Sequence, residues 1–433
     1  MENQNTIFEK VVSLCKRRGF FYPASDIYGG LNGIWDKGPL GTTLARNIEK
    51  YWIDFMQQNS QYPLLLVDGA ILGSQQMWKA SGHVDGFHDP LVDCLACNAR
   101  VRADDVNLEK PCTRCGNKKW SEIRKFNMMF STQLGAMEGS DTTCYLRPET
   151  AQTIFVQFKN IITTNRVKIP FGIMQIGKAF RNEITPKQFI FRSREFSQME
   201  MEFFCHPDSA WDFFSYWVNL RYKFFLSLDI NENKIRITPH KKEDLSHYSQ
   251  ATSDIEFLYP FGWKEIEGIA YRTDFDLRSH TEHSKKNLSI HDEKTNSSYI
   301  PHVIESSIGV ERLLLVLLCN AYYEDLENAD TRIVLRLPFS IAPFQIAIFP
   351  LSKQEIEIAH SIQKTLQNNF RTTYDDNSSI GKRYRRQDEI GTPYCITVDQ
   401  DSTINDTVTI RHRDTKKQVI IKIENIQNYF NDF

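Results

Sequence analysis

The segments Arg181–Glu183 (RNE) and Phe191–Glu202 (FRSREFSQMEME) decide the fold of this chain. Apolar residues in and around them predict two strands, 173–181 and 194–204, joined by a polar and basic loop. Successive side chains of a strand point to opposite faces, so the second strand carries two sets of residues. One set is apolar and belongs to a core, and the other comprises Phe196, Gln198, Glu200 and Glu202.

The polar face of this second strand indicates a binding site. Carboxylates within an apolar strand are costly to bury unless they meet a cation. The alternative is an antiparallel sheet with one solvated face, whose carboxylates simply face water. Arg181 and the loop arginines favour a site, because guanidinium groups bind phosphate and carboxylate, and Phe196 can stack on a purine. We therefore expect a sheet with one phosphate-binding end and one ammonium-binding end.

A further cation lies where a helix dipole disfavours it. Residues 309–318 predict a helix, and Arg312 falls in its first turn. An anion bound at the same helix end would explain this placement, whereas pairing with a surface carboxylate is the alternative. The sequence contains neither GxxxxGK[ST] nor GxGxxG. A nucleotide's phosphates would therefore have to be held by side chains.

The flanking segments predict a mixture of helices and strands. Helical periodicity spans 44–55, and a short apolar run at 63–68 predicts a buried strand. An amphipathic helix should begin at Pro148–Glu149 and run through Phe158, because proline is tolerated in a first helical turn. The charged stretch 241–298 shows no clear period, so we expect an irregular insertion there.

Four of the nine cysteines form two CxxC pairs. They are Cys94, Cys97, Cys112 and Cys115, within a stretch, 81–120, that loses its apolar periodicity. Four thiolates on two such turns suit tetrahedral Zn²⁺ and leave no open position for catalysis. We expect a structural zinc site, and four reduced thiols without metal are the alternative.

The pattern changes again near 338–343. Beyond this point short strands and helices alternate, which predicts a small α/β domain with a mixed sheet. Cationic and aromatic residues at 382–386 and 411–417 are candidates for nucleic-acid binding, with solvated surface charge as the alternative.

The composition is that of an ordinary globular protein. The chain has 433 residues, 41% of them hydrophobic, and a formal net charge of -2. This length predicts two or three domains, and the near-zero charge means that a polyanion would have to be bound by local patches. The N-terminus lacks a signal-peptide pattern, and the apolar run 313–318 is too short to cross a membrane. We therefore expect a cytoplasmic protein without a membrane segment.

Together these motifs resemble the class II aminoacyl-tRNA synthetases, and in particular the glycyl-tRNA synthetases of the bacterial dimeric type. Residues 27–41 (IYGGLNGIWDKGPLG) are similar to the motif 1 region, 180–183 with 196–200 to motif 2, and 305–312 to motif 3. Residues 78–83 (WKASGH) are similar to the segment that precedes the family's zinc-ribbon-like insertion.

The resemblance implies an α+β protein of two domains. Residues 1–338 would form the class II antiparallel-sheet catalytic domain, with a zinc-ribbon-like insertion at 81–120 and the irregular insertion at 241–298. Residues 339–433 would form an α/β anticodon-binding domain.

The resemblance also implies the site residues, which we carry over position by position. The ATP contacts would be Arg181, Asn182, Glu183, Phe191, Arg192, Ser193, Arg194, Glu195, Phe196, Glu265, Ile266, Gly309, Val310, Glu311 and Arg312. The glycine contacts would be Arg102, Glu149, Phe196, Ser197, Gln198, Met199, Glu200, Glu305, Ser306, Ser307, Ile308 and Gly309.

The implied activity is ATP-dependent ligation of glycine to tRNA(Gly) through glycyl-adenylate, with AMP and pyrophosphate as products. Arg181 and Arg312 would be the catalytic residues, and Glu265 would help to orient Mg²⁺ bound to ATP. Positioning and electrostatics suffice, because the glycine carboxylate is already a nucleophile. The implied assembly is a homodimer.

Two positions depart from the family pattern, which usually has proline at Ser306 and an aromatic residue at Lys37. Neither departure removes a charged group, so we expect activity. An accessory, non-catalytic relative is the main alternative, although such a relative should have lost Arg181 and Arg312. A synthetase for histidine, proline or threonine is the other; the acidic Gln198 and Glu200 face and the cysteine insertion fit glycine better.

Overall fold

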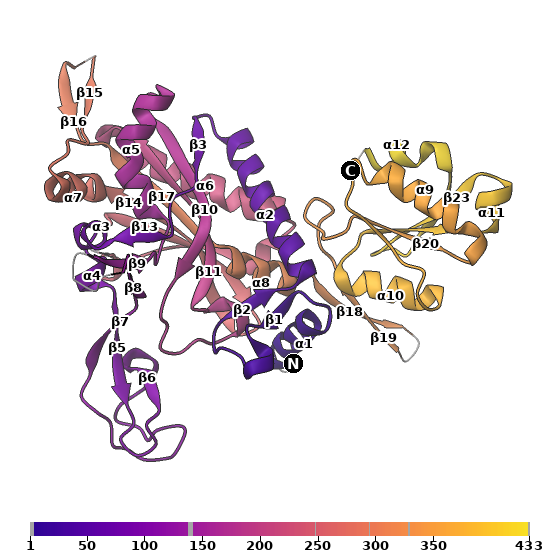
Figure 1. Ribbon diagram of the computed structural model, residues 1–433, viewed down its shortest axis with the longest axis horizontal. Helices are drawn as coiled ribbons and strands as arrows, with labels where there is room; N and C mark the ends of the chain where they lie inside the picture. Colours follow the sequence, from indigo (N-terminus) through magenta and orange to yellow (C-terminus); the bar gives the residue numbers. More distant parts are fainter. Residues whose placement is uncertain (1–3, 137–141, 247, 294, 328–329, 432–433) are drawn as a thin grey trace.

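The computed structural model describes residues 4–136, 142–246, 248–293, 295–327 and 330–431. A larger body surrounds a seven-stranded sheet, and a smaller C-terminal body surrounds a five-stranded sheet (Figure 1). The hairpin of β18 (Tyr322–Glu327) and β19 (Asp330–Leu335) lies between them. None of the described helices is both long enough and apolar enough to span a membrane.

The seven-stranded sheet has the order β12-β13-β14-β17-β11-β10-β3. All neighbours are antiparallel except β3, which runs parallel to β10. The predicted paired strands are β10 and β11, and their register places Gln175 opposite Glu200. The bounds are β3 (Leu64–Val67), β10 (Phe171–Phe180), β11 (Glu195–Cys205), β12 (Ile235–Pro239), β13 (Ala251–Tyr259), β14 (Gly262–Thr273) and β17 (His302–Gly309).

The expectation of an irregular insertion at 241–298 is wrong for much of that range. β13 and β14 lie there, and both are interior strands of the large sheet. Their charged residues obscured the period because several of them face a cavity or form buried pairs, as Glu267 does with Arg221 at 2.6 Å. Only a small two-stranded hairpin, β15 (Ile290–Asp292) and β16 (Ser297–Tyr299), projects from the end of this region.

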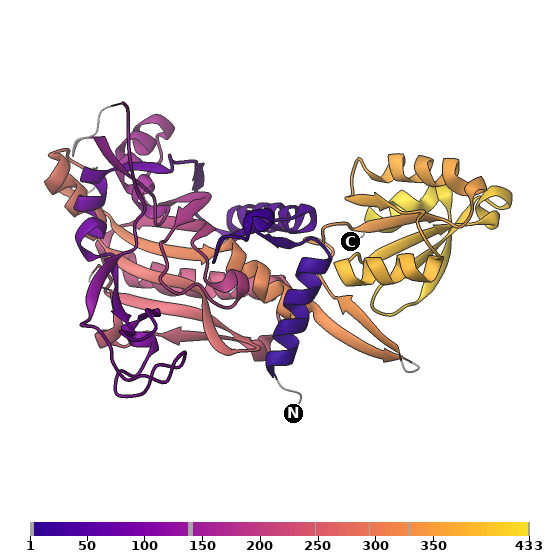
Figure 2. The ribbon, with the colours of Figure 1, turned by 60° about the horizontal axis from the view of Figure 1, so that its bottom comes forward.

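Helices cover both faces of the large sheet (Figure 2). One face packs against α2 (Pro39–Asn59), α6 (Ala210–Ser227) and α8 (Val310–Ala321), with α1 (Gln4–Arg17) beside them. The other face packs, over part of its length, against α5 (Ala151–Asn165) and α7 (Phe275–Ser284). Leucines and aromatic residues at helical spacing bury these faces, as Trp52 and Trp217 illustrate.

α5 begins later than predicted. Its first residue is Ala151, with Thr150 at the N-cap, rather than Pro148. The backbone N–H of Thr150 donates to the carboxylate of Glu200 at 2.9 Å, so the preceding segment is held against β11. Glu149 is thereby placed beside the sheet instead of on a helix.

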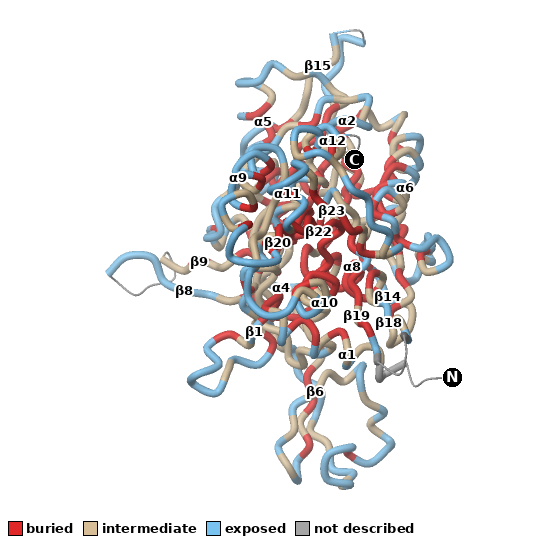
Figure 3. The backbone as a smooth tube through the Cα atoms, turned by 90° about the vertical axis from the view of Figure 1, so that its right-hand side faces the viewer, coloured by how far each residue is buried: buried red, intermediate tan, exposed pale blue. Residues whose placement is uncertain are grey.

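Smaller elements extend from the sheet and are largely exposed (Figure 3). The cysteine-bearing insertion contains β5 (His88–Asp93), β6 (Arg100–Arg102) and β7 (Arg124–Asn127) in one sheet. Nearby lie α3 (Gln75–Ala80) and α4 (His83–Gly86), and a second sheet of β4 (Leu72–Ser74), β8 (Ser131–Gln133) and β9 (Thr143–Leu146). β1 (Phe21–Pro23) and β2 (Trp35–Lys37) pair near the N-terminus.

The C-terminal body has a mixed sheet, as predicted. Its order is β21-β20-β22-β23-β24; the first three strands are parallel and the last two pair antiparallel. The strands are β20 (Ile346–Pro350), β21 (Thr372–Tyr374), β22 (Tyr394–Val398), β23 (Thr407–His412) and β24 (Gln418–Lys422). The helices are α9 (Ile356–Leu366), α10 (Ile380–Ile390), α11 (Gln400–Ile404) and α12 (Ile426–Asn431).

Ion pairs join the C-terminal body to the rest of the chain. Arg332 of β19 pairs with the buried Asp388 of α10 at 2.7 Å. Arg17 and Arg18 at the end of α1 both pair with Glu389, at 2.7 and 2.5 Å. Because β18 follows α8 directly, the helix that carries Arg312 is linked through this hairpin to α10.

Candidate active site

A cavity of about 400 Å³ lies over the uncovered part of the α5 and α7 face of the large sheet. It is formed by alternate residues of β11, β13, β14 and β17, whose other alternate residues belong to the core beneath. The structure brings most of the predicted residues to this cavity. They are Arg102, Glu149, Arg181, Glu183, Phe191, Arg192, Ser193, Phe196, Gln198, Glu200, Glu265, Ile266, Glu305, Ser307, Gly309, Glu311 and Arg312.

The remaining predicted residues do not line the cavity, because the predicted ranges include both faces of each strand. They are Asn182, Arg194, Glu195, Ser197, Met199, Ser306, Ile308 and Val310. Met199, Ile308 and Val310 are buried in the core. Arg194 instead donates to the backbone oxygen of Asn32 at 2.6 Å, which ties the glycine-rich segment 29–33 to the loop before β11.

Sequence reasoning missed other residues that line the cavity. They are Met128, Ile190, His240, Tyr248, Thr252, Asp254, Gly268 and Ala270. Half of them lie on β13 and β14, in the range predicted to be irregular. The period-two spacing of the buried Ile255, Phe257 and Tyr259 was the signal that could have revealed this strand.

One end of the cavity is acidic. Glu149 precedes α5, Glu200 lies on β11 and Glu305 lies on β17. The guanidinium of Arg272, buried on β14, donates to Glu305 at 2.5 Å and to Asp276 at 2.7 Å. The acidic face of β11 therefore meets a buried cation, and the alternative of a half-solvated sheet does not hold for Glu200, which is 2% exposed.

Burial and charge shift the pKa values of these carboxyl groups in different directions. Burial, only partly offset by Arg272, raises the pKa of Glu305 to about 7. Burial and the neighbouring Glu149 raise the pKa of Glu200. Burial alone would raise the pKa of Glu149, but His83 at 3.2 Å and Arg272 hold it well below its usual range. The acidic end thus contains one strongly ionised carboxylate and two that protonate more readily.

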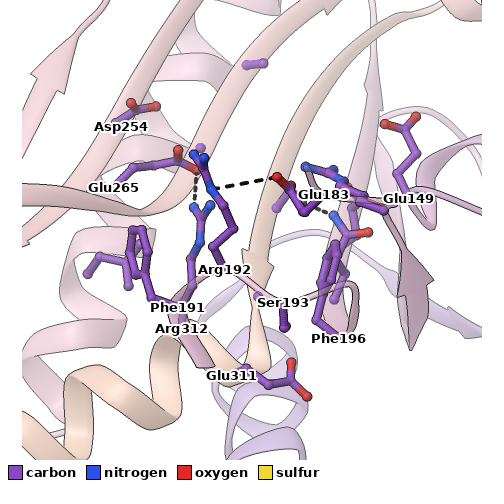
Figure 4. Close-up of a pocket in the computed structure, with 18 of the residues that line it drawn as sticks. Glu149, Glu183, Phe191, Arg192, Ser193, Phe196, Asp254, Glu265, Glu311 and Arg312 are labelled. Carbon is purple, nitrogen blue, oxygen red and sulfur yellow. Dashed lines mark hydrogen bonds and ion pairs between the residues drawn. The ribbon is translucent and has the colours of Figure 1, made fainter. Parts of the chain in front are cut away.

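Arginines line the rest of the cavity. Arg181 follows β10, and its Nε donates to the backbone oxygen of Pro148, next to Glu149, at 3.0 Å. Its guanidinium carbon lies 5.3 Å from the ring centroid of Phe196. Arg312 lies in the first turn of α8 and pairs with Glu265 at 3.0 Å. In Figure 4, Arg312 and Glu265 lie on one side of the cavity and Glu149 on the other. Arg312 is therefore separated from Glu149, whereas Arg181 contacts the residue before Glu149.

Asp254 and His240 add a second polar pair near the arginine end. The two side chains are 2.8 Å apart, and Asp254 lies beside Glu265 in Figure 4. Burial alone would lower the pKa of His240, but its hydrogen bond with Asp254 raises it. Carboxylate oxygens in this position are the ligands that Mg²⁺ prefers.

The two positions that depart from the family pattern both contact buried carboxylates. Lys37 forms a hydrogen bond with Glu311, whose other oxygen accepts from the backbone N–H of Ser197 at 2.8 Å. Ser306 donates from its hydroxyl to Glu267 at 2.6 Å, on the core side of the sheet. Lys37 therefore links β2 to the first turn of α8. Ser306 donates to a carboxylate of the buried Arg221–Glu267 ion pair and does not line the cavity.

The four predicted metal ligands are brought together. Their sulfur atoms all lie within 4.8 Å of one another, and the four residues are Cys94, Cys97, Cys112 and Cys115. The Sγ atoms of Cys94 and Cys115 are 3.6 Å apart, and those of Cys97 and Cys112 are 3.9 Å apart. Tetrahedral Zn–S bonds of about 2.3 Å require S–S separations of about 3.8 Å, so the cluster has the size of a zinc site.

The cationic residues predicted to bind nucleic acid divide into two groups. Arg383, Arg411 and Arg413 are buried; Arg383 donates to the backbone oxygen of Pro350 at 2.6 Å, for example. Lys382 and Lys417 are exposed. The buried arginines hold the C-terminal body together, so the exposed lysines are the better candidates.

Comparison with known proteins identifies both bodies. Residues 134–321 match the model of the "tRNA synthetase class II core domain (G, H, P, S and T)", and residues 345–432 match that of the "Anticodon binding domain". The chain is 52% identical to a glycine–tRNA ligase of Acetivibrio thermocellus, over 99% of each chain. It is 51% identical to that of Ruminiclostridium cellulolyticum, over 98% of this chain and 97% of the relative, and 50% identical to that of Clostridium kluyveri, over 98% of each. The chain belongs to the glycine–tRNA ligase family, and it combines a class II catalytic core with an anticodon-binding domain.

Proposed function

We propose that the cavity binds ATP and glycine side by side and joins them as glycyl-adenylate before the glycyl group passes to tRNA(Gly). The observation that carries this proposal is the layout of one cavity. It holds the carboxylates of Glu149, Glu200 and Glu305 at one end, Arg312 with Glu265 on the far side, and Arg181 beside Phe196. The catalytic residues are Arg181 and Arg312, and the predicted ATP and glycine contacts that line the cavity form the site.

The acidic end fits the ammonium group of glycine. An ammonium has three N–H donors, and Glu149, Glu200 and Glu305 offer carboxylate oxygens around the same space. Glycine has no side chain to recognise, so selectivity arises by exclusion. We expect a methyl group to be excluded because it would displace fixed polar groups, such as Glu305 paired with Arg272, and displacing them costs hydrogen bonds.

The arginine end fits the triphosphate. A carboxylate oxygen of glycine attacks the α-phosphorus of ATP, and the bond to the bridging oxygen breaks, so pyrophosphate leaves with the electron pair. Arg181 stabilises the negative charge that develops at the α-phosphate, and Arg312 holds the terminal phosphates. Phe196, beside Arg181, offers a flat surface to the adenine ring. The ribose hydroxyl at the tRNA's 3′ end then attacks the glycyl carbonyl and AMP leaves.

Mg²⁺ that accompanies ATP fits the carboxylates at this end. Glu265 and Asp254 would hold it, and the ion would supply positive charge to the phosphates. Glu265 already pairs with Arg312, so the carboxylate also fixes the arginine in the cavity.

We infer that the cysteine cluster holds a structural zinc and that the insertion is a zinc-ribbon-like unit. The sulfur separations support it, and Cys94 and Cys112 are buried although the surrounding elements are short. β6 of this insertion carries Arg102, which lines the cavity and lies 3.3 Å from Asp89. The zinc would therefore hold one cavity residue in place without contacting the substrates.

We further propose that the protein is a homodimer that forms through its motif 1 region. Large apolar side chains are exposed there, including Ile27 at 88% and Tyr28 at 86%. Surface of this kind favours a protein interface.

We also propose that the chain divides into residues 1–338 and 339–433. The large sheet and the linking hairpin lie before this boundary, and the small sheet lies after it. None of the nine cysteines, all of which lie in the described residues, forms a disulfide, which supports a location in the cytoplasm.

Amino-acid-dependent exchange between pyrophosphate and ATP tests the activity. We expect exchange with glycine, and none above background with alanine, serine, histidine, proline or threonine. Exchange supported by proline or threonine would refute the glycine assignment. Absence of exchange with every amino acid would favour the accessory protein over the enzyme.

A further inference from the structure

Glu202 is a fully buried carboxyl group behind the acidic end of the cavity. It lies on β11 two residues after Glu200, on the same face, and directly opposite Glu305 of β17. Its exposed fraction is 0%, and neither of its carboxyl oxygens has a hydrogen-bond partner among the described residues. An ionised carboxylate in that position would lack the donors that make burial of a charge tolerable.

The groups that face Glu202 carry more negative than positive charge. One oxygen each of Glu200, Glu202 and Glu305 lies within 4.8 Å of the others. The cation that faces them is Arg272 of β14. Its guanidinium donates hydrogen bonds to Glu305 of β17 and to Asp276 of α7. The hydrogen bonds of Arg272 therefore go to Glu305 and Asp276 and not to Glu202. Burial, and then Glu305 and Glu200, raise the pKa of Glu202 well above its ordinary value, although Arg272 acts in the opposite direction.

We propose that Glu202 is a positioning residue for the amino-acid site, and that it carries a proton and donates a hydrogen bond to Glu305. The pairing is set by the register of β11 and β17, which places the two side chains opposite each other. Glu305 is then held from two sides, by Arg272 and by the protonated Glu202. This inference rests on the proposed binding of glycine at the acidic end.

The proton on Glu202 would limit the negative charge of the acidic end to the carboxylates that face the ammonium group of glycine. With Glu202 neutral, the carboxylates left to face the ammonium group are Glu149, Glu200 and Glu305. An ionised Glu202 would instead repel Glu305 across the strand pair, because like charges directly opposite are destabilising. It would displace the carboxylate that Arg272 orients.

Thermal unfolding as a function of pH tests the proton without any substrate. A carboxyl group that stays protonated when folded and ionises when unfolded makes the wild-type protein lose stability as pH rises above about 4.3. Glu202→Gln mimics the protonated group and removes this loss. We therefore expect the melting temperature of Glu202→Gln to exceed that of the wild type by an amount that grows between about pH 5 and about pH 8. A difference that changes in the opposite direction would show that Glu202 is ionised, and would overturn the proposal.

Kinetics of pyrophosphate exchange test the positioning role. Glu202→Gln keeps a neutral donor, so the KM for glycine should stay within about twofold of the wild type. Glu202→Leu removes the donor, so the KM for glycine should rise about tenfold or more while the KM for ATP is unchanged. A loss of glycine binding in Glu202→Gln that equals the loss in Glu202→Leu would overturn the proposal, and so would an unchanged KM in Glu202→Leu. If Glu202→Leu does not fold, the two measurements on Glu202→Gln decide.

The two experiments separate this inference from the proposed function. If another amino acid were the substrate, no glycine-dependent exchange would occur in the wild type. The pH dependence of unfolding would still report whether Glu202 holds a proton.

Discussion

At the scale of single residues, the chemistry depends on charges that a sheet holds at fixed separations. Arg181 and Phe196 come from paired strands, so the guanidinium and the aromatic ring keep their 5.3 Å distance without a ligand. Arg312 is fixed by Glu265 in the same way. Groups that are already in place need little reorganisation as charge shifts to the α-phosphate.

Arg181→Ala should abolish adenylate formation without unfolding the protein. Loss of one preorganised donor to a developing charge lowers rates by about 10²–10³-fold. Arg181 makes one side-chain hydrogen bond that the structure shows, to the backbone oxygen of Pro148 at 3.0 Å, so the melting temperature should change little. Glycine-dependent pyrophosphate exchange and thermal unfolding measure the two effects. A stable variant with wild-type exchange would remove Arg181 from the mechanism.

Glycine binding should weaken as pH falls through neutrality. Burial raises the pKa of Glu305 to about 7, so this carboxylate loses its charge, and its attraction for an ammonium group, below that pH. The KM for glycine should therefore rise at least about threefold between about pH 8 and about pH 6, with the KM for ATP unaffected. Glu305→Gln is the control, and it should bind glycine weakly at all pH values. A flat profile in the wild type would contradict this assignment.

Many of the site residues could be predicted from the sequence, because successive side chains of a strand point to opposite faces of the sheet. The placement of Glu200, Gln198 and Phe196 on one face follows from the period of two. The role of Arg272 could not be foreseen, because Glu305 reaches it only through the pairing of β14 with β17, although its other partner, Asp276, is four residues away in the chain. Pairing of distant strands is a tertiary property, and no local pattern reports it.

At the scale of elements, neighbouring serines of β17 serve opposite faces of the sheet. Ser306 satisfies the buried Glu267 on the core side, whereas Ser307 lines the cavity and accepts a hydrogen bond from Gln198 at 3.2 Å. Ser306 therefore stabilises the core, whereas its neighbour Ser307 belongs to the binding site.

Ser306→Ala should lower the free energy of unfolding by about 1–2 kcal/mol, because a buried hydrogen bond to a charged group is lost. Its KM for glycine should not change. Ser307→Ala is the matched variant, and we expect the reverse, a smaller effect on stability and a raised KM for glycine. Denaturant unfolding and exchange kinetics on both variants check the pair. Equal effects of the two substitutions on KM would contradict the division between faces.

The insertion should need its metal to keep Arg102 in the cavity. Cys112→Ser should lower the zinc content from about one ion per chain and raise the KM values of the substrates, because none of the three residues of β6 is buried. Arg102→Ala is the control, which should reproduce the kinetic defect while keeping the zinc. Elemental analysis gives the metal content. Wild-type protein with well under one zinc per chain would refute the zinc-ribbon-like unit.

Several elements followed from apolar periodicity, as the agreement for α2 and β3 shows. β13 and β14 did not, because residues such as Asp254 and Glu265 face the cavity and interrupt the apolar pattern. α5 began late for a similar reason, since Thr150 donates to Glu200 instead of continuing the helix. In these two cases the sequence pattern fails because residues of the element serve the site.

At the scale of the whole molecule, the hairpin β18–β19 connects the catalytic core to the anticodon-binding domain. It follows α8, and its Arg332 pairs with Asp388 of α10. A net charge of -2 is compatible with tRNA binding because the cations are local.

Exposed lysines of α10 and of the turn between β23 and β24 should contribute to tRNA binding. Lys382→Glu combined with Lys417→Glu should raise the KM for tRNA in aminoacylation and reduce its dependence on salt, while pyrophosphate exchange stays normal. Lys364→Glu is the control, since α9 packs on the other face of the same sheet. An equal effect of the control would show that net charge, rather than this face, matters.

A structure of the protein with a non-hydrolysable glycyl-adenylate analogue is the decisive experiment for the proposed site. We expect the ammonium group among Glu149, Glu200 and Glu305, with the phosphate at Arg181 and the adenine on Phe196. An analogue bound in the reverse direction, with its ammonium group at Glu265, or bound outside this cavity, would refute the proposed site.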